Sequence, residues 1–133
     1  ISVYPPLSAA RSPSDGELVD GFRPFAERLR AWAARTNERY LFTEVGYPAL
    51  PTAAARPWDY RAAGPVDLAM QQRCYRALFR AWHADPRLAG VYLWNWFGPG
   101  GPADPGYSPR GKPALQVIRR WYMGSRARSK EPR

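Results

Sequence analysis

The segment Tyr40-Leu-Phe-Thr-Glu-Val-Gly-Tyr47 decides how the chain is interpreted. Its aromatic and β-branched residues predict a β-strand over 40–46 that ends in a glycine turn. Strands are depleted in glutamate, so Glu44 near the end of this strand requires an explanation. Three explanations are open: its carboxylate binds a cation, pairs with an arginine in the core, or takes part in chemistry.

Strand-like and helical segments alternate on both sides of Glu44. Pro24 is expected to kink or split the predicted helix over 17–35. Gln71 falls on the apolar, inward face of the predicted helix over 65–84. The order β-α-β-α-β-α predicts a parallel sheet with right-handed crossovers. In chain order, the predicted elements are a strand over 1–4, helix 17–35, strand 40–46, helix 65–84, strand 90–96 and helix 113–122.

Three strands with helices on one side would make a poor domain by themselves. The pattern fits the closing section of a (β/α)8 TIM barrel, which needs about 250 residues in all. A small open α/β sheet is the alternative. We expect residues 1–122 to form the barrel portion and residues 123–133 to be a basic, disordered tail. The chain begins with Ile1 and not with Met, so we expect it to be part of a longer protein, which leaves localisation open.

The charge of the chain raises the question of a polyanionic partner. The formal net charge is +9, and such a balance favours nucleic acid or another polyanion. The arginines, however, fall along predicted helices as solvated faces, and no nucleic-acid-binding motif accompanies them. No segment is long and apolar enough to cross a bilayer. We therefore expect neither a nucleic-acid partner nor a membrane.

Residues that bind metals or cofactors are scarce. The sequence has one histidine, His83, and one cysteine, Cys74, so a zinc site, a Ser-His-Asp triad and an internal disulfide are not expected. The run Gly98-Pro-Gly-Gly-Pro-Ala103 matches a dinucleotide fingerprint only nominally, because prolines interrupt it and no helix opens directly behind it. Gly111-Lys112 is followed by Pro113 and forms no phosphate loop. No cofactor and no metal are predicted.

Three unusual features fall at the carboxyl ends of the predicted strands, where barrels of this kind form their active sites. Tyr4 ends the first strand, Glu44 lies near the end of the second, and Trp94-Asn95-Trp96 ends the third. A carboxylate, a phenol donor, an amide and indole rings together suit a carbohydrate, whose C–H faces pack on aromatic rings. Tyr4, Trp94 and Trp96 could instead simply fill the barrel wall.

The order and spacing of several motifs resemble glycoside hydrolase family 113, which comprises retaining β-mannanases with a (β/α)8 barrel. The resemblance extends over nearly the whole chain up to about Tyr122. It rests on the runs Phe42-Thr-Glu-Val-Gly-Tyr47, Pro57-Trp-Asp-Tyr60, Val66-Asp-Leu68, Gln72-Arg-Cys-Tyr75, Gly90-Val-Tyr-Leu-Trp-Asn-Trp96 and Tyr107-Ser-Pro-Arg-Gly-Lys-Pro113.

The resemblance implies roles for individual residues. The three strands would be barrel strands six to eight, and Glu44 would be the nucleophile. Tyr4 would orient the nucleophile, although Pro5-Pro6 stands where a second aromatic residue is expected. Trp94 would form the floor of the cleavage subsite, with Trp96 on the same side.

Further substrate contacts are expected from Asn95, from Tyr47 and from Trp58 and Tyr60 in the loop after the second strand, although Trp58 could instead anchor that loop. The acid/base would lie on strand four, which precedes Ile1, so the missing N-terminal part of the barrel would be a partner and the chain alone would be inactive. The expected substrate is β-1,4-mannan or a related β-linked chain. The alternative is a non-catalytic carbohydrate-binding or interaction remnant of such a barrel.

Overall fold

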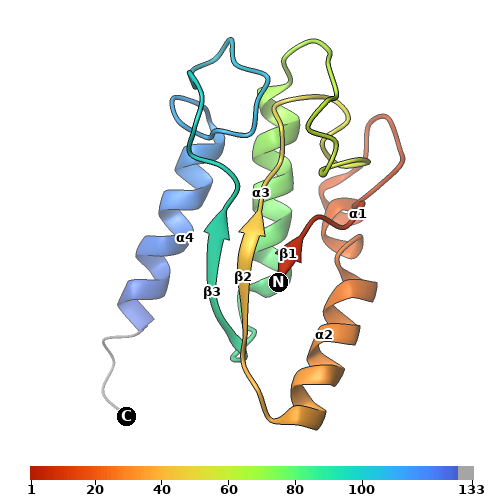
Figure 1. The fold of residues 1–133 in the computed structure, drawn as a ribbon, viewed down its shortest axis with the longest axis vertical. Coiled ribbons are helices and arrows are strands. Elements are labelled where there is room, and N and C mark those ends of the chain that lie inside the picture. Colours follow the sequence, from red (N-terminus) through yellow and green to blue (C-terminus); the bar gives the residue numbers. More distant parts are fainter. Residues whose placement is uncertain (129–133) are drawn as a thin grey trace.

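The three strands form one parallel sheet in the computed structural model, which describes residues 1–128. The strands β1 (Ser2–Val3), β2 (Tyr40–Val45) and β3 (Leu88–Leu93) pair in the order β1-β2-β3 (Figure 1). Both pairings are parallel, as the alternation of strands and helices predicts. Their carboxyl ends therefore meet at one edge of the sheet, and Figure 1 shows the long loops gathered at that edge.

The first predicted helix is divided into α1 (Asp15–Asp20) and α2 (Arg23–Thr36). The predicted effect of Pro24 is confirmed as a split, because proline is tolerated in the first turn of α2 but not inside a continuous helix. Ser14 begins α1 with a capping box, in which its hydroxyl accepts from the Glu17 amide and Glu17 accepts from the Ser14 amide.

The other two helices differ from prediction at their ends. Helix α3 (Leu68–Trp82) starts three residues after Pro65, because Asp67 caps it and accepts from the Met70 amide at 2.8 Å. Helix α4 (Ala114–Arg128) continues beyond Tyr122. Residues 123–128, expected to be part of a disordered tail, thus belong to this helix. Residues 129–133 of the expected tail lie outside the described residues.

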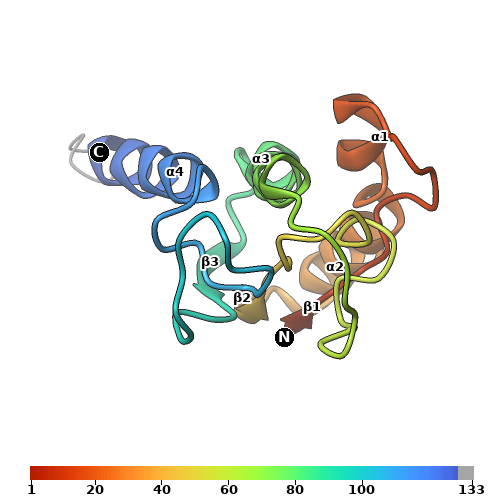
Figure 2. The same cartoon turned by 90° about the horizontal axis from the view of Figure 1, so that it is seen from above.

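The helices cover one face of the sheet, as the view from above shows (Figure 2). Phe42 and Trp82 meet there edge to face, with ring centroids 4.9 Å apart. Val91 and Leu78 are buried in the same core. Thr43 and Tyr92 are exposed, and in the described part of the chain no helix covers that opposite face. A sheet with one covered face is what a section of a barrel wall presents.

None of the helices described, from α1 to α4, has the length and apolar character that crossing a membrane requires.

Candidate active site

Glu44 and Tyr4 form the centre of the candidate site. The parallel register places Ser2 beside Glu44, and Tyr4 follows directly after β1. The Tyr4 hydroxyl donates to Glu44 Oε1 at 2.7 Å, and the Ser2 hydroxyl donates to Oε2 at 3.3 Å. Among the described residues, no lysine or arginine pairs with Glu44. The structure thus brings together the two residues that the sequence assigns to chemistry, and it does not show the core ion pair that was the structural alternative.

The protonation of Tyr4 fits its place beside a carboxylate. Burial raises the pKa of the Tyr4 phenol, and the hydrogen bond to Glu44 and the negative charge of Glu44 raise it further. Tyr4 therefore remains a neutral hydrogen-bond donor over the whole range in which a glycosidase would work. Tyr4 holds Oε1 at 2.7 Å, whereas Ser2 approaches Oε2 only to 3.3 Å, so Oε2 is the less tightly bound of the two carboxylate oxygens.

An irregularity in β2 keeps Glu44 out of the core. The pairing of β2 with β3 shifts between Phe42 and Val45, and both of these residues are fully buried. Two residues, Thr43 and Glu44, therefore lie between two buried positions where a regular strand would place only one. Thr43 is exposed and Glu44 is partly exposed. The strand thus accommodates a carboxylate without burying it unpaired.

Trp94 lies directly beside the end of β2. Its backbone amide donates to the Val45 carbonyl at 2.8 Å, and its indole is substantially exposed. The peptide bond between Trp94 and Asn95 is cis. Asn95 follows at the same edge and is half-buried. Trp94 and Glu44 therefore occupy the carboxyl ends of neighbouring strands, as the sequence predicts.

Trp96 lies beyond the end of β3, which stops at Leu93. It lines a groove with Leu93, Leu115 and Tyr122, between β3 and α4. Trp96 thus lies beside α4, next to the edge strand β3, whereas Glu44 on the central strand β2 is bonded to Ser2 and Tyr4 at the other edge strand. The expectation that Trp94 and Trp96 point to the same side of the sheet assumes that both lie in β3, but this strand ends at Leu93, before either residue.

Tyr47 is fully buried in the core. Its ring meets the Tyr75 ring edge to face at 5.2 Å, and its carbonyl accepts from Gln71 Nε2 at 2.9 Å. A side chain in this position offers no surface to a substrate, so we do not retain Tyr47 in the candidate site. Trp58, by contrast, is 49% exposed and Tyr60 is 73% exposed.

Sequence reasoning missed the residues that hold the loops together. Gln71 Nε2 donates to the carbonyls of Tyr47 and Tyr107 at 2.9 and 3.1 Å, and so joins the loops after β2 and β3. Lys112 is buried in an ion pair with Asp104 at 3.1 Å and also donates to the Gly106 carbonyl. A glutamine on the inward face of a helix was the available signal for Gln71, whereas nothing in the sequence distinguishes Lys112 from a surface lysine.

The loop after β1 belongs to the same assembly. The Leu7 amide donates to the Ala54 carbonyl at 2.7 Å, which connects it to the loop after β2. The Ala49 amide, in turn, donates to the Pro105 carbonyl at 2.8 Å in the loop after β3. The loops after all three strands are therefore joined by hydrogen bonds at the carboxyl edge of the sheet.

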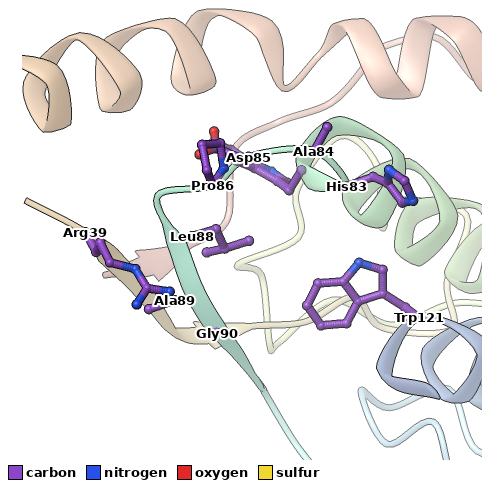
Figure 3. A pocket seen from close by; sticks show the side chains of 10 residues that line it. Arg39, His83, Ala84, Asp85, Pro86, Leu88, Ala89, Gly90 and Trp121 are labelled. Atoms are coloured by element: carbon purple, nitrogen blue, oxygen red, sulfur yellow. The ribbon is translucent and has the colours of Figure 1, made fainter. Parts of the chain in front are cut away.

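A separate pocket lies at the opposite, amino-terminal edge of the sheet, between β3 and the end of α3 (Figure 3). Its lining includes Arg39, His83, Asp85 and Trp121. Asp85 accepts from Arg30 Nε at 2.6 Å and from the Arg87 amide, so its carboxylate has a structural role. Over residues 1–128, no cluster of His, Cys, Asp and Glu is arranged to hold a metal ion.

The family model of Glycoside Hydrolase Family 113 matches residues 2–100, whereas a search of curated proteins found no match. A solved structure described as a GH113 β-mannanase, AaManA from Alicyclobacillus acidocaldarius in complex with ManMIm, is 35% identical to the chain, with a TM-score of 0.70. A complex structure of a GH113 β-1,4-mannanase is 22% identical with a TM-score of 0.74, and this likeness shows the fold alone.

Both comparisons cover 79% of this chain and only 36% of the solved chain, so the chain spans about a third of the length of these structures. The three parallel strands fit part of a barrel of that kind. The match of the family model over most of the chain confirms the resemblance seen in the sequence: the chain belongs to glycoside hydrolase family 113.

Proposed function

We propose that the full-length protein is a retaining glycoside hydrolase that cleaves β-1,4-mannan, with Glu44 as its nucleophile. The observation that carries the proposal is the 2.7 Å hydrogen bond from Tyr4 to Glu44 at the carboxyl end of β2, beside Trp94. The family supplies the reaction class. The β-mannanase description of the structure that is 35% identical supports mannan as the substrate.

In the proposed reaction, Glu44 Oε2 attacks the anomeric carbon while Tyr4 holds Oε1. The bond between that carbon and the glycosidic oxygen breaks, and a carboxylic acid about 5–5.5 Å away protonates the departing oxygen. A covalent glycosyl-enzyme results. Water then attacks the same carbon, the second carboxylate removes its proton, and Glu44 is released. Trp94 would pack its indole against the sugar at the point of cleavage.

The second carboxyl group is proposed to come from outside this chain. The acids of the described loops at the carboxyl edge are engaged elsewhere: Asp59 pairs with Arg56, Asp104 pairs with Lys112, and Asp67 caps α3. This fits the assignment of β1, β2 and β3 to barrel strands six, seven and eight, with the acid/base on strand four. The 133-residue chain alone is then expected to show no turnover, and turnover by the isolated chain would refute the assignment.

The test uses Glu44→Ala in the full-length protein. This variant should lose mannan cleavage, and added azide should restore turnover: azide occupies the space left by the carboxylate and attacks the anomeric carbon, the bond to the protonated glycosidic oxygen breaks, and a glycosyl azide of inverted configuration forms. Glu27→Gln, which changes an exposed carboxylate on α2, is the matched control and should behave as the parent protein. Mannan cleavage by Glu44→Ala without azide would exclude Glu44 as nucleophile. Absence of cleavage by the parent protein would favour a non-catalytic binding role.

A further inference from the structure

The loop after β2 presents two aromatic side chains to solvent at the carboxyl edge of the sheet. Trp58 and Tyr60 are exposed within the short turn 57–60. Backbone hydrogen bonds from Asp59 to Arg56 and from Tyr60 to Trp58, at 3.1 and 2.9 Å, shape this turn. Large aromatic rings are costly to leave in water, and carbohydrate chains present C–H faces that such rings bind. The turn is therefore a candidate platform for sugar units beyond the cleavage point.

A tyrosine from the next loop holds this turn in place. The Tyr107 hydroxyl donates to the Pro57 carbonyl at 2.6 Å, and both groups are buried. Burial raises the pKa of Tyr107 to about 12, with a contribution from the charge of Asp59. The phenol therefore stays protonated and keeps its role as donor. Pro57 directly precedes Trp58, so this hydrogen bond fixes the backbone from which the indole projects.

The other side of Tyr107 lies against the catalytic edge. Its ring atom Cδ1 is 3.2 Å from the position that a β-carbon on Gly46 would occupy, a position also approached by the Trp94 carbonyl. Gln71 Nε2 also donates to the backbone carbonyls of Tyr107 and Tyr47, and these two hydrogen bonds hold the Tyr107 backbone in place. Tyr107 thus connects the backbone beside Trp94 with the backbone beside Trp58.

We propose that Tyr107 is a positioning residue, whose hydroxyl holds the Trp58 turn as a binding platform for distal sugar units of a polysaccharide. The inference rests on the proposed function. A pre-positioned aromatic side chain binds its ligand more tightly because less loop motion is lost on binding. Tyr107 makes no contribution to bond cleavage in this scheme, so its removal affects long substrates and leaves short ones unaffected.

The experiment compares Tyr107→Phe with the parent in the full-length protein, using mannohexaose and a short aryl mannoside that reaches only the cleavage position. The loss of one hydrogen bond should raise KM for mannohexaose about fivefold, with kcat unchanged. The kcat/KM for the aryl mannoside should stay within about twofold of the parent. Tyr40→Phe, which removes a hydroxyl from a buried ring at the amino-terminal end of β2, is the control and should change neither value.

A double variant tests whether Tyr107 acts through the turn. Trp58→Ala should show the same difference between long and short substrates, and adding Tyr107→Phe to it should cause no further rise in KM. Equal losses on both substrates, additive effects, or an unchanged KM for mannohexaose in Tyr107→Phe would each overturn the proposal. If Tyr107→Phe does not fold, an unchanged KM for mannohexaose in Trp58→Ala would overturn it. These results are separate from those for Glu44→Ala, which test the reaction itself.

Discussion

A β-carbon on Gly46 would lie 1.6 Å from the carbonyl oxygen of Trp94. The backbone of the segment after β2 therefore passes Trp94 at a distance that only glycine permits. The requirement is one of space, because Gly46 is not among the glycines with positive φ. Gly46 is two residues from Glu44, so this contact sets the position of the carboxylate relative to the indole.

Gly46→Ala should accordingly lower the free energy of unfolding by about 3 kcal/mol, since the added methyl group meets backbone and not a flexible side chain. It should also lower kcat, because Trp94 and Glu44 would be displaced relative to each other. Gly16→Ala is the matched control: its β-carbon would meet the Ser14 hydroxyl at 3.8 Å, an ordinary contact. Urea unfolding of both variants measures the difference, and equal stabilities would contradict the steric argument.

Tyr4→Phe keeps the ring and removes the donor to Glu44. Hydrogen bonds to charged groups contribute about 1.5–3 kcal/mol, so we expect kcat to fall about 10- to 100-fold. Steady-state kinetics and thermal unfolding of the same preparation provide the measurement. Ser2→Ala removes the more distant donor, at 3.3 Å, and should have a much smaller effect. A similar kcat for Tyr4→Phe and the parent would show that the hydrogen bond has no part in turnover.

Lys112→Met should destabilise the protein strongly. The Lys112 side chain is 0% exposed and that of Asp104 is 9% exposed, so the substitution leaves a buried carboxylate without its partner, at a cost of about 3–5 kcal/mol. Arg23→Met breaks the exposed pair of Arg23 with Asp20 and should cost less than about 1 kcal/mol. Denaturant unfolding of the two variants should separate them clearly, and a small effect of Lys112→Met would mean that the ion pair does not stabilise the loop.

Asp15 should make stability depend on pH in the acid range. Its hydrogen bond with Arg73, together with the charges of Arg73 and Arg76, lowers its pKa below the ordinary value of 3.8, against the opposing effect of desolvation. Because the folded pKa is the lower one, Asp15 contributes stability above about pH 4, and this contribution is lost as pH falls through the folded pKa.

Asp15→Asn should therefore cost up to about 1 kcal/mol at neutral pH, where the pair is partly exposed, and progressively less below about pH 4. Unfolding measured at neutral and acid pH tests this difference. In an Arg73→Gln background, Asp15→Asn should cost less than in the parent, because its main partner is gone. A cost that is the same at both pH values would contradict the assignment.

The sequence was sufficient for those features that depend on local pattern. Alternating strands and helices predict the parallel sheet, and Pro24 predicts the interruption between α1 and α2. The meeting of Tyr4 and Glu44 follows from the rule that parallel strands share a carboxyl edge. These inferences need only the spacing of apolar residues that is typical of strands and helices, and the direction in which the chain runs.

Features set by tertiary contacts could not be predicted in the same way. The position of Trp96 depends on where β3 stops pairing, and the sequence over 90–96 reads as an uninterrupted strand. Tyr47 is polar enough to suggest a ligand contact, yet the Gln71 and Tyr75 side chains of α3 enclose it. The burial of Lys112 depends on Asp104, which becomes its partner only when the loop closes on itself.

The bonds from Leu7 to Ala54 and from Ala49 to Pro105 have a consequence for protein engineering. The loop after β2 is bonded to both of the others, so replacing it alone with a loop of different backbone path would leave the Leu7 amide and the Pro105 carbonyl without their partners. Chimeras that replace residues 4–14, 46–67 and 94–113 together should be accepted more readily than single-loop grafts. The three loops are thus expected to be transplantable only as one hydrogen-bonded unit.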